Sequence, residues 1–455
     1  MLSIEILITN THSQIVCNAK LHKLLSDVLS YEVEGSFFAR RNNPYWDGRK
    51  RFLKKDGTYP TGLTKMVCKW CREEGVKYTF KDLREKPTPD VTYAPTFDKP
   101  PRYYQEDARE VSLRRFRGVY LMGTGAGKTL TSALIVAARG VQALYVTPDT
   151  GLREQAYDDY KKWFGEKMVS RDIESNMPIV IDNIQSLVRK DPALFKRFKM
   201  LIVDEFHHSA SDSYIDMNLH CTEAFYRYGF TGTFVRTDGT DMRMHGVLAD
   251  IIFTKTASEL IEEGFLVRPY ITMWQLKLPR KAMSYKEAYA FMKTYEPMNE
   301  IIVNRAIEKS IKQKKQTLIL VRHKDHGRLL ESRIPGAIFV SGDDSMEDRN
   351  AIKKRFNDKK LRCMIGTSIF GEGQDIPSID HLINGRGEKT EIQTSQGVGR
   401  ALRLAPGKDK AEIDDFFFVG QKHLQSHSTE RLQTYRKESA FRVQVVEPAA
   451  PSLFS

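Results

Sequence analysis

The chain has 455 residues, and its 71 lysines and arginines against 58 aspartates and glutamates leave a formal charge of +13. This length predicts two or three domains, and 41% apolar with 28% charged residues exclude a disordered tail or a fibre. Five cysteines are too few for a disulfide scaffold, so we expect a reduced, intracellular setting. The charge favours a polyanionic partner but does not separate nucleic acid from an anionic membrane or from simple solubility.

Neither a membrane span nor an export signal is expected. No run approaches the ~18 consecutive apolar residues of a membrane helix. The first residues, MLSIEILITNTHSQ, lack a basic n-region and a small-residue cleavage site. We therefore expect a cytoplasmic protein that does not use a membrane.

The first block of the chain, residues 1–86, is separated from the rest by a proline-rich segment. Residues 87–101 carry Pro87, Pro89, Pro95, Pro100 and Pro101. Such a density of proline cannot sustain a helix or a central strand, so the segment is predicted to be an extended linker. Residues 1–86 are then a small domain, which we expect to be α+β.

Within this block, residues 36–72 are strongly basic. They hold ten lysines and arginines against Asp47 and Asp56, a local charge of +8, with seven aromatic residues interleaved. Cations suit phosphates and rings can stack on bases, so we expect nucleic-acid contacts here. The alternative is an aromatic core with a solvated basic face, and we expect Trp46 to be partly packed. The candidate contacts are Arg40, Arg41, Trp46, Arg49, Lys50 and Arg51.

Cys68 and Cys71 form a lone CxxC pair. Zinc needs four ligands, and only Cys17 or a distant histidine could complete the set. Two buried cysteines on a helix are the alternative, and the sequence does not decide between them.

After the linker, short β-branched apolar runs alternate with amphipathic segments, which predicts parallel strands joined by helices. Residues 102–270 and 311–455 therefore form two α/β domains in tandem, joined by a mostly helical, polar connection over residues 271–310. The expected strands are residues 119–122, 143–146, 179–181, 201–203 and 228–230 in the first domain, and 317–321, 338–340, 363–365, 382–384 and 416–419 in the second.

A phosphate-binding loop follows the first of these strands. The segment MGTGAGKT, residues 122–129, is predicted to lie between a strand and a helix, the context that a P-loop requires. Its backbone N–H groups, from Gly123, Thr124, Gly125, Ala126 and Gly127, would surround phosphate oxygens. Lys128 would neutralise the β- and γ-phosphates, and the Thr129 hydroxyl would hold Mg²⁺. The usual first glycine is Met122 here, and the alternative is a glycine-rich turn with a chance lysine.

The expected partner of this loop is LIVDEFHH, residues 201–208, an apolar strand that ends in two carboxylates about 75 residues later. Asp204 would complete the Mg²⁺ shell and Glu205 would orient the attacking water. A strand followed by an ordinary acidic turn is the alternative. His207 is assigned a coupling role and His208 the surface, since no matching Cys/His pair supports a metal.

At this point the motifs resemble those of superfamily 2 helicases. The P-loop, the DEFH box, Thr231-Gly232-Thr233 and QGVGRALR at residues 396–403 occur in the family's order. The resemblance implies two RecA-like domains and ATP hydrolysis. It assigns adenine recognition to Gln105, coupling to Thr231 and Thr233, arginine fingers to Arg400 and Arg403, a γ-phosphate or water contact to Gln396 and a place near the ribose to Asp375. Phe234 departs from the usual proline.

The same resemblance places nucleic-acid contacts at the ends of strands in both domains, where hydroxyls and backbone amides suit phosphates. Any one of them could instead be an ordinary surface residue. They are Thr147, Pro148, Arg153, Gln185 and Ser186 in the first domain, and Arg322, Ser341, Gly342 and Thr367 in the second.

YWDGRKRFL at residues 45–53, YPTGL at 59–63 and SELIEEGFL at 258–266 resemble UvsW-type phage helicases. That likeness implies an ATP- and Mg²⁺-dependent enzyme that remodels branched DNA by fork reversal, branch migration and D-loop or R-loop unwinding. Forked DNA and RNA–DNA hybrids are the implied partners, a monomer is favoured, and the host cytoplasm is the setting if the chain is of phage origin. The alternatives are an RNA helicase, a restriction-type motor, a binding module with a degenerate ATPase, or a membrane-surface protein.

Overall fold

The computed structural model describes residues 3–33, 36, 46–208, 211–232, 241–278, 283–367, 379–388, 398–399 and 401–448. Contacts divide the chain into two compact units, Met1–Met122 with Gly127–Thr254, and Gly123–Ala126 with Lys255–Ser455. Several predicted site residues lie outside the described residues: Arg40, Arg41, Thr233, Asp375, Gln396 and Arg400.

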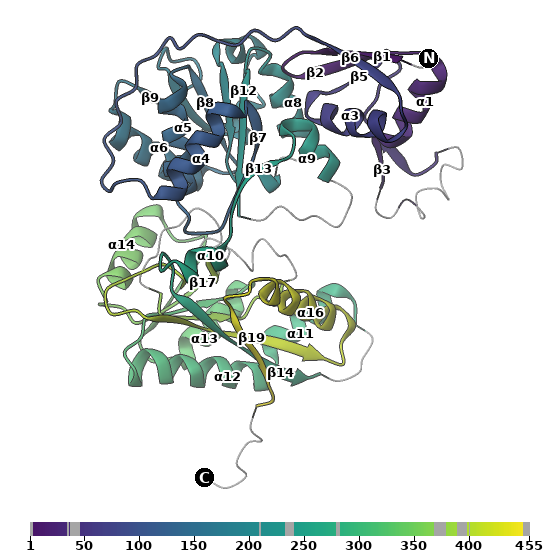
Figure 1. The fold of residues 1–455 in the computed structure, drawn as a ribbon. Coiled ribbons are helices and arrows are strands. Elements are labelled where there is room, and N and C mark those ends of the chain that lie inside the picture. Colours follow the sequence, from purple (N-terminus) through teal and green to yellow (C-terminus); the bar gives the residue numbers. More distant parts are fainter. Residues whose placement is uncertain are drawn as a thin grey trace. The chain divides into compact units, whose positions relative to one another are not determined.

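The first unit begins with a small α+β domain (Figure 1). In the described residues its main sheet has the order β5-β2-β1-β6, with β1 antiparallel to β2 and parallel to β6. Ile4 and Ile6 alternate with exposed residues along β1 and pack with Leu21 and Leu25 of one helix and Val67 of another. The elements are β1 (Ser3–Ile8), β2 (His12–Val16), α1 (Ala19–Val28), β3 (Ser30–Glu32), β4 (Arg49–Arg51), β5 (Thr58–Pro60), η1 (Thr61–Leu63), α3 (Thr64–Glu73) and β6 (Lys77–Asp82).

This small domain is docked on the α/β domain that follows it, beside α8 and α9 in Figure 1. A Cβ atom at Gly62 would collide with the backbone carbonyls of His245 and Gly246, so η1 and α9 approach closely. Met242 of α9 packs against the small core, and Lys65 forms an ion pair with Asp250. The amino-terminal domain is therefore part of the first unit.

The α/β domain of the first unit is built on a sheet whose described strands have the order β13-β7-β12-β11-β8-β10-β9. The pairings from β7 through to β9 are parallel. Leu201, Ile202 and Val203 are fully buried, as expected for a central strand covered on both faces. The elements are α4 (Tyr103–Arg114), β7 (Arg117–Met122), α5 (Lys128–Arg139), β8 (Ala143–Thr147), α6 (Thr150–Phe164), β9 (Val169–Ser170), β10 (Ile179–Asn183), α7 (Ile184–Leu187), η2 (Pro192–Arg197), β11 (Met200–Val203), η3 (Phe206–His208), α8 (Asp212–His220), β12 (Tyr226–Thr231), α9 (Asp241–Leu248) and β13 (Ile251–Lys255).

The second unit contains a further parallel sheet, of order β16-β17-β15-β18-β19-β14-β20 among the described residues. The predicted fold class, two tandem RecA-like parallel sheets after a small α+β domain, is confirmed. The elements are α10 (Ala257–Glu262), β14 (Arg268–Lys277), α11 (Tyr285–Thr294), α12 (Glu296–Ala306), the π-helical turn η4 (Ile307–Lys312), β15 (Thr317–Leu320), α13 (Lys324–Arg333), β16 (Ala337–Val340), α14 (Met346–Asn357), β17 (Cys363–Gly366), β18 (His381–Asn384), β19 (Lys410–Val419), α16 (Lys422–Lys437) and β20 (Arg442–Val446).

All ten strands expected in the two α/β domains are present, although the connection over residues 271–310 differs from its prediction at one end. It opens with most of β14, which pairs with β19 and β20, and becomes helical only from α11 onward. Pro269, Ile271 and Met273 are buried at alternate positions of β14, a strand period that the polar helices after it obscured in the sequence.

Candidate nucleotide and nucleic-acid sites

The glycine-rich loop joins β7 to α5 as predicted. Gly125 and Gly127 have φ values of +87° and +78°, the left-handed region that side chains disfavour. Gly127 is the N-cap of α5, so Lys128 and Thr129 occupy its first turn. A Cβ atom at Gly127 would collide with the side-chain amide of Gln105, which therefore lies against the loop.

The two carboxylates stand at the carboxyl end of β11. Asp204 is 5% exposed and its Oδ1 accepts a hydrogen bond of 2.9 Å from the Glu205 N–H. Glu205 has a φ of +42°, a strained conformation for a residue with a side chain. Burial, and then the charge of Glu205, raise the pKa of Asp204 to about 6, while Lys128 opposes the rise.

Lys128 lies between the loop and the carboxylates. Its Nζ is 3.3 Å from Oε1 of Glu205, and the two side chains are 14% and 11% exposed. Among the described residues, Glu205 is the acidic side chain that forms an ion pair with Lys128. Since β7 and β11 flank β12 in the sheet, parallel pairing brings loop and acids to one edge.

Two of the predicted coupling residues, His207 and Thr231, meet at the same edge. Nδ1 of His207 is 3.0 Å from the Thr231 hydroxyl and 3.4 Å from Oε2 of Glu205. Thr231 ends β12 and is fully buried, and His207 is 2% exposed. A continuous contact therefore runs from the carboxylate pair to the end of the neighbouring strand.

This edge offers hard oxygen donors and one cation in a buried setting. The Thr129 hydroxyl and the Asp204 carboxylate are ligand types that Mg²⁺ prefers, and Lys128 suits phosphate oxygens. The donor set therefore fits a magnesium–nucleotide complex.

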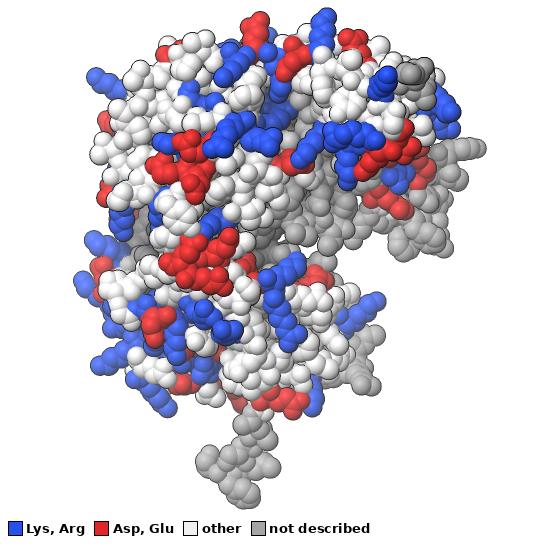
Figure 2. All heavy atoms as spheres, viewed as in Figure 1, with Lys and Arg blue, Asp and Glu red and all other residues white. Residues whose placement is uncertain are grey.

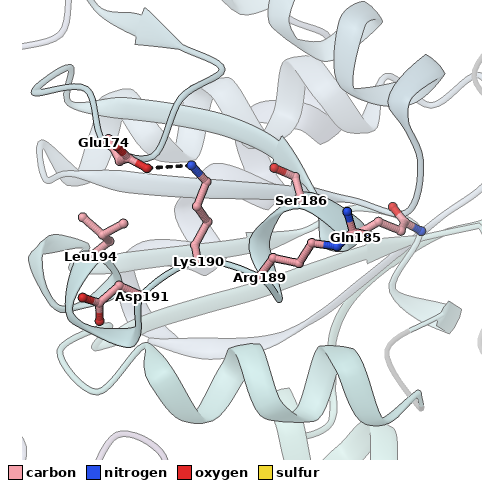
Figure 3. Close-up of a pocket in the computed structure, with 7 residues that line it drawn as sticks. All are labelled: Glu174, Gln185, Ser186, Arg189, Lys190, Asp191 and Leu194. Carbon is pink, nitrogen blue, oxygen red and sulfur yellow. Dashed lines mark hydrogen bonds and ion pairs between the residues drawn. The ribbon is translucent and has the colours of Figure 1, made fainter.

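A groove lies beside this edge, where β8 and β10 end. It is a cavity of about 960 Å³ lined by residues that include Gln185, Ser186, Arg189 and Lys190, and Gln185 and Arg189 also line a neighbouring cavity of about 320 Å³. Figure 3 shows Arg189 extending toward Gln185 while Lys190 points to Glu174, with which it pairs at 2.7 Å. The Gln185 amide donates to the Pro148 carbonyl at 2.7 Å, which joins the two strand ends.

Arg189 and Lys190 were not among the residues predicted from sequence. The available signal was their position just after Gln185 and Ser186, in the turn that follows α7. Of the predicted contacts nearby, Thr147 is fully buried and its hydroxyl donates to the Asp149 carbonyl. Arg153 is paired with Glu154 and Asp182. Gln185 and Ser186 line the groove, and Pro148 lines the neighbouring cavity.

In the second unit the predicted contacts also share one edge, because β15, β17 and β16 are neighbours. Ser341 and Thr367 are only 2% and 7% exposed, whereas Gly342 is exposed. Arg322 follows β15 and stacks on the ring of Tyr289 at 4.3 Å. Of the two predicted arginine fingers, Arg403 lies within the described residues, and burial lowers its pKa.

Part of the basic amino-terminal segment is engaged within the protein. Arg49 donates to the Ser30 hydroxyl at 2.8 Å, and Arg51 pairs with Asp27 and Asp47. Trp46 is half-buried, and its indole N–H donates to the Arg49 carbonyl at 3.1 Å. Lys50 is exposed and makes no salt bridge with a described residue. Figure 2 shows basic and acidic side chains interspersed on the face in view.

Cys68 and Cys71 both lie in α3 and are buried in the small core. In the part of the chain that the structure describes, no group of three or more His, Cys, Asp or Glu side chains is arranged to hold a metal ion. Nor does any helix in that part have the length and apolar character needed to cross a bilayer.

Comparison with known families matches three regions of the chain. Residues 4–81 match the model "DNA helicase UvsW, N-terminal", residues 98–236 match "Type III restriction enzyme, res subunit", and residues 298–405 match "Helicase conserved C-terminal domain". The chain is 24% identical to the ATP-dependent DNA helicase uvsW of Enterobacteria phage T4, covering 94% of this chain and 96% of that protein.

Other relatives match a large part of the chain. The DNA 3'-5' translocase XPB2 of Sulfurisphaera tokodaii is 25% identical over 69% of this chain and 80% of its own. A fragment of a putative HsdR subunit of a type I restriction enzyme from Vibrio vulnificus YJ016 has a TM-score of 0.61 at 19% identity, covering 88% of this chain and 75% of that one. This likeness shows that the chain and the HsdR fragment share a fold.

Proposed function

We propose that this chain, which resembles UvsW, is an ATP-hydrolysing superfamily 2 helicase that uses ATP to remodel branched DNA. The observation that carries this proposal is the match of residues 4–81 to the UvsW amino-terminal model in the same chain as both helicase regions. The models matched by residues 98–236 and 298–405 name a restriction-enzyme subunit and a general helicase domain, so the match of the amino-terminal domain is the feature that points to forks and junctions.

In this proposal the nucleotide lies between the glycine-rich loop and the acids of β11. Lys128, now 3.3 Å from Glu205, would turn to the β- and γ-phosphates. Thr129 and Asp204 would hold Mg²⁺, which supplies charge neutralisation when bound. Glu205 would orient the attacking water, Gln105 would contact the adenine, and His207 with Thr231 would carry the change at the phosphates to the next strand. Gln396, Arg400, Arg403 and Asp375 are assigned their roles by family resemblance.

The strand would cross the carboxyl edge of each sheet. In the first unit the groove offers Gln185, Ser186 and Arg189, and Arg189 makes no salt bridge with a described residue. In the second unit Arg322 and Gly342 lie at the corresponding edge. Because the amino-terminal domain packs on the first unit, a duplex held by that domain would move with it.

ATP hydrolysis with and without forked DNA tests the proposal, using the wild-type chain and Lys128→Ala. We expect the fork to stimulate the wild type and the variant to lose about 10²-fold or more of its rate, since a charged group at the transferring phosphates is removed. Lys167→Ala, which removes an exposed lysine outside the groove, is the matched control. Equal rates for Lys128→Ala and the wild type, or no response to DNA, would refute the proposal.

A substrate panel then separates the rival functions. Forks, three- and four-way junctions, R-loops, linear duplex and single-stranded RNA are compared at equal concentration. We expect branched DNA to stimulate most. The strongest response to single-stranded RNA would identify an RNA helicase, and equal response to linear and branched duplex would identify a restriction-type motor.

The lysines of the small domain provide a further test. Lys50, Lys54 and Lys55 are exposed and make no salt bridge with a described residue. We expect the triple alanine variant to bind junctions with a shallower dependence on salt. The slope of log affinity against log salt concentration should fall by up to roughly 0.9 for each phosphate contact that is lost. Arg51→Ala, which breaks pairs within the domain, serves for comparison. An unchanged slope in the triple variant would exclude this surface from DNA binding.

A further inference from the structure

An exposed aromatic ring beside a held arginine distinguishes one surface of the second unit. Tyr285, the first residue of α11, is 42% exposed. The Arg322 guanidinium, just beyond β15, lies 5.4 Å from the Tyr285 ring and donates a hydrogen bond of 3.0 Å to its hydroxyl. Neither residue belongs to the nucleotide site.

Arg322 is held in place by the buried ring of Tyr289. Its guanidinium lies 4.3 Å from the centre of the Tyr289 ring, which is 2% exposed. The Tyr289 hydroxyl in turn donates to the Gly387 carbonyl at 2.7 Å and contacts Nδ1 of His427 at 2.6 Å. A guanidinium held in this way has little rotamer freedom left to lose when it binds a ligand.

Within the part of the chain that the structure describes, the Arg322 guanidinium also retains N–H donors that make no hydrogen bond. Two of its N–H groups are directed to the Tyr285 hydroxyl and, at 3.8 Å, to Glu388, whereas a guanidinium carries five. The partly exposed His423 has its ring 6.0 Å from that of Tyr285, and the exposed Lys286 and Lys422 adjoin Tyr285 and His423 in the sequence. Figure 1 shows α11 and α16, which carry these groups, side by side.

An exposed ring with adjacent cations is the combination that binds unpaired nucleotides, because the ring stacks on a base while the cations take the phosphate. We propose that Tyr285 and Arg322 form a platform for an unpaired base of a DNA strand and its phosphate. The platform rests on the proposed function, and it lies at the carboxyl edge of the second sheet, where that strand would pass. Its ligand is a single strand or the opened arm of a junction rather than intact duplex.

A second exposed tyrosine supplies a matched control. Tyr270, at the start of β14, is 48% exposed and has Lys410 at 5.6 Å from its ring. That pair lies at the amino-terminal end of β14 and β19, and Lys410 is already paired with Glu412 at 3.2 Å. The two tyrosines therefore match in exposure and in having a neighbouring cation but differ in position.

The test measures affinity of the full chain for a single-stranded oligonucleotide and for a blunt duplex, with quenching of 2-aminopurine in the single strand as a direct report of stacking. Tyr285→Ala is expected to weaken single-strand binding roughly tenfold and to abolish the quenching, with little change for duplex. The single-strand affinity of Tyr285→Phe, which keeps the ring, should stay within about threefold of the wild-type value. The single-strand affinity of Tyr270→Ala should equal that of the wild type.

Several outcomes would overturn the platform. Wild-type affinity and quenching in Tyr285→Ala would remove it, as would equal losses for single strand and duplex, or an equal loss in Tyr270→Ala. Failure of the underlying function is distinguishable, because the wild type itself would then show neither DNA binding nor stimulated ATP hydrolysis.

Discussion

Pairs of adjacent buried acids occur at two strands of this molecule, and the two pairs differ in how many hydrogen-bond donors and cations surround them. Asp204 and Glu205 follow β11, where one lysine and one histidine lie within ion-pair distance of Glu205. Asp414 and Asp415 lie in β19, where Asp414 accepts from Trp274, Arg305 and His381. Asp415 accepts from Arg431, Tyr435 and Asn384.

The difference is visible in the pKa of the first acid of each pair. Burial and the neighbouring Glu205 raise the pKa of Asp204 to about 6. Burial acts in the same direction on Asp414, but the hydrogen bond and charge of His381, followed by Arg305, outweigh it and lower the pKa. The pair at β19 is compensated within the protein, whereas the pair at β11 keeps negative charge that a cation can still neutralise. The same substitution at the two strands should therefore act on different properties.

Asp415→Asn should have the largest effect, and on stability. Arg431 is 1% exposed and would be left with its buried charge uncompensated, so we expect the free energy of unfolding to fall by about 3–5 kcal/mol. Urea unfolding measures the loss. The exposed Asp409, changed to asparagine, should stay within about 0.5 kcal/mol of the wild type. A loss at Asp415 as small as that at Asp409 would mean that the β19 network is not structural.

Glu205→Gln should reverse this profile. The amide cannot orient or activate water as the carboxylate does, so ATP hydrolysis should fall by about 10²–10³-fold. One of two repelling charges disappears, so the free energy of unfolding should stay within about 1 kcal/mol or rise. Steady-state hydrolysis and urea unfolding of the same preparation give both numbers. A stability loss as large as that of Asp415→Asn would place the two acid pairs in one class.

Lowering the pH should reduce the stability of the second unit through the buried His326. His326 is 2% exposed, its Nε2 is 2.8 Å from Oδ1 of Asn299, and burial lowers its pKa from 6.5 to about 4. The unfolded chain binds this proton first as pH falls, so the stability contribution is complete above pH 6.5 and is lost toward pH 4. The full loss is on the order of 3 kcal/mol. His326→Gln should reduce the change in unfolding free energy between pH 6.5 and 5, and an equal slope in the variant would exclude this histidine.

The comparison also shows how far sequence reasoning reaches. The loop at Lys128 and the acids after β11 were predictable, because phosphate chemistry fixes residue types at short spacings along one strand–loop–helix unit. Asp414 and Asp415 present much the same local pattern, two acids beside an apolar run. What makes them structural comes from Arg305, His381 and Arg431, which belong to other elements, so no local motif records it. Arg49 and Arg51 were predicted as DNA contacts from composition alone, and composition does not reveal that Ser30, Asp27 and Asp47 engage them.

The smallest effect should come from the link between the acids and β12, where Thr231→Val removes the hydroxyl that contacts His207. A hydrogen bond of this kind is worth about 1 kcal/mol, so we expect strand separation per ATP hydrolysed to fall about fivefold while hydrolysis itself changes by less than about twofold. Thr231→Ser, which keeps the hydroxyl, should behave as the wild type. Unwinding of a labelled fork and phosphate release, followed in one reaction, separate the two activities. If both fall together, the contact serves hydrolysis at Glu205. If neither falls, the change at the β11 acids reaches the DNA strand by a route other than the contact between His207 and Thr231.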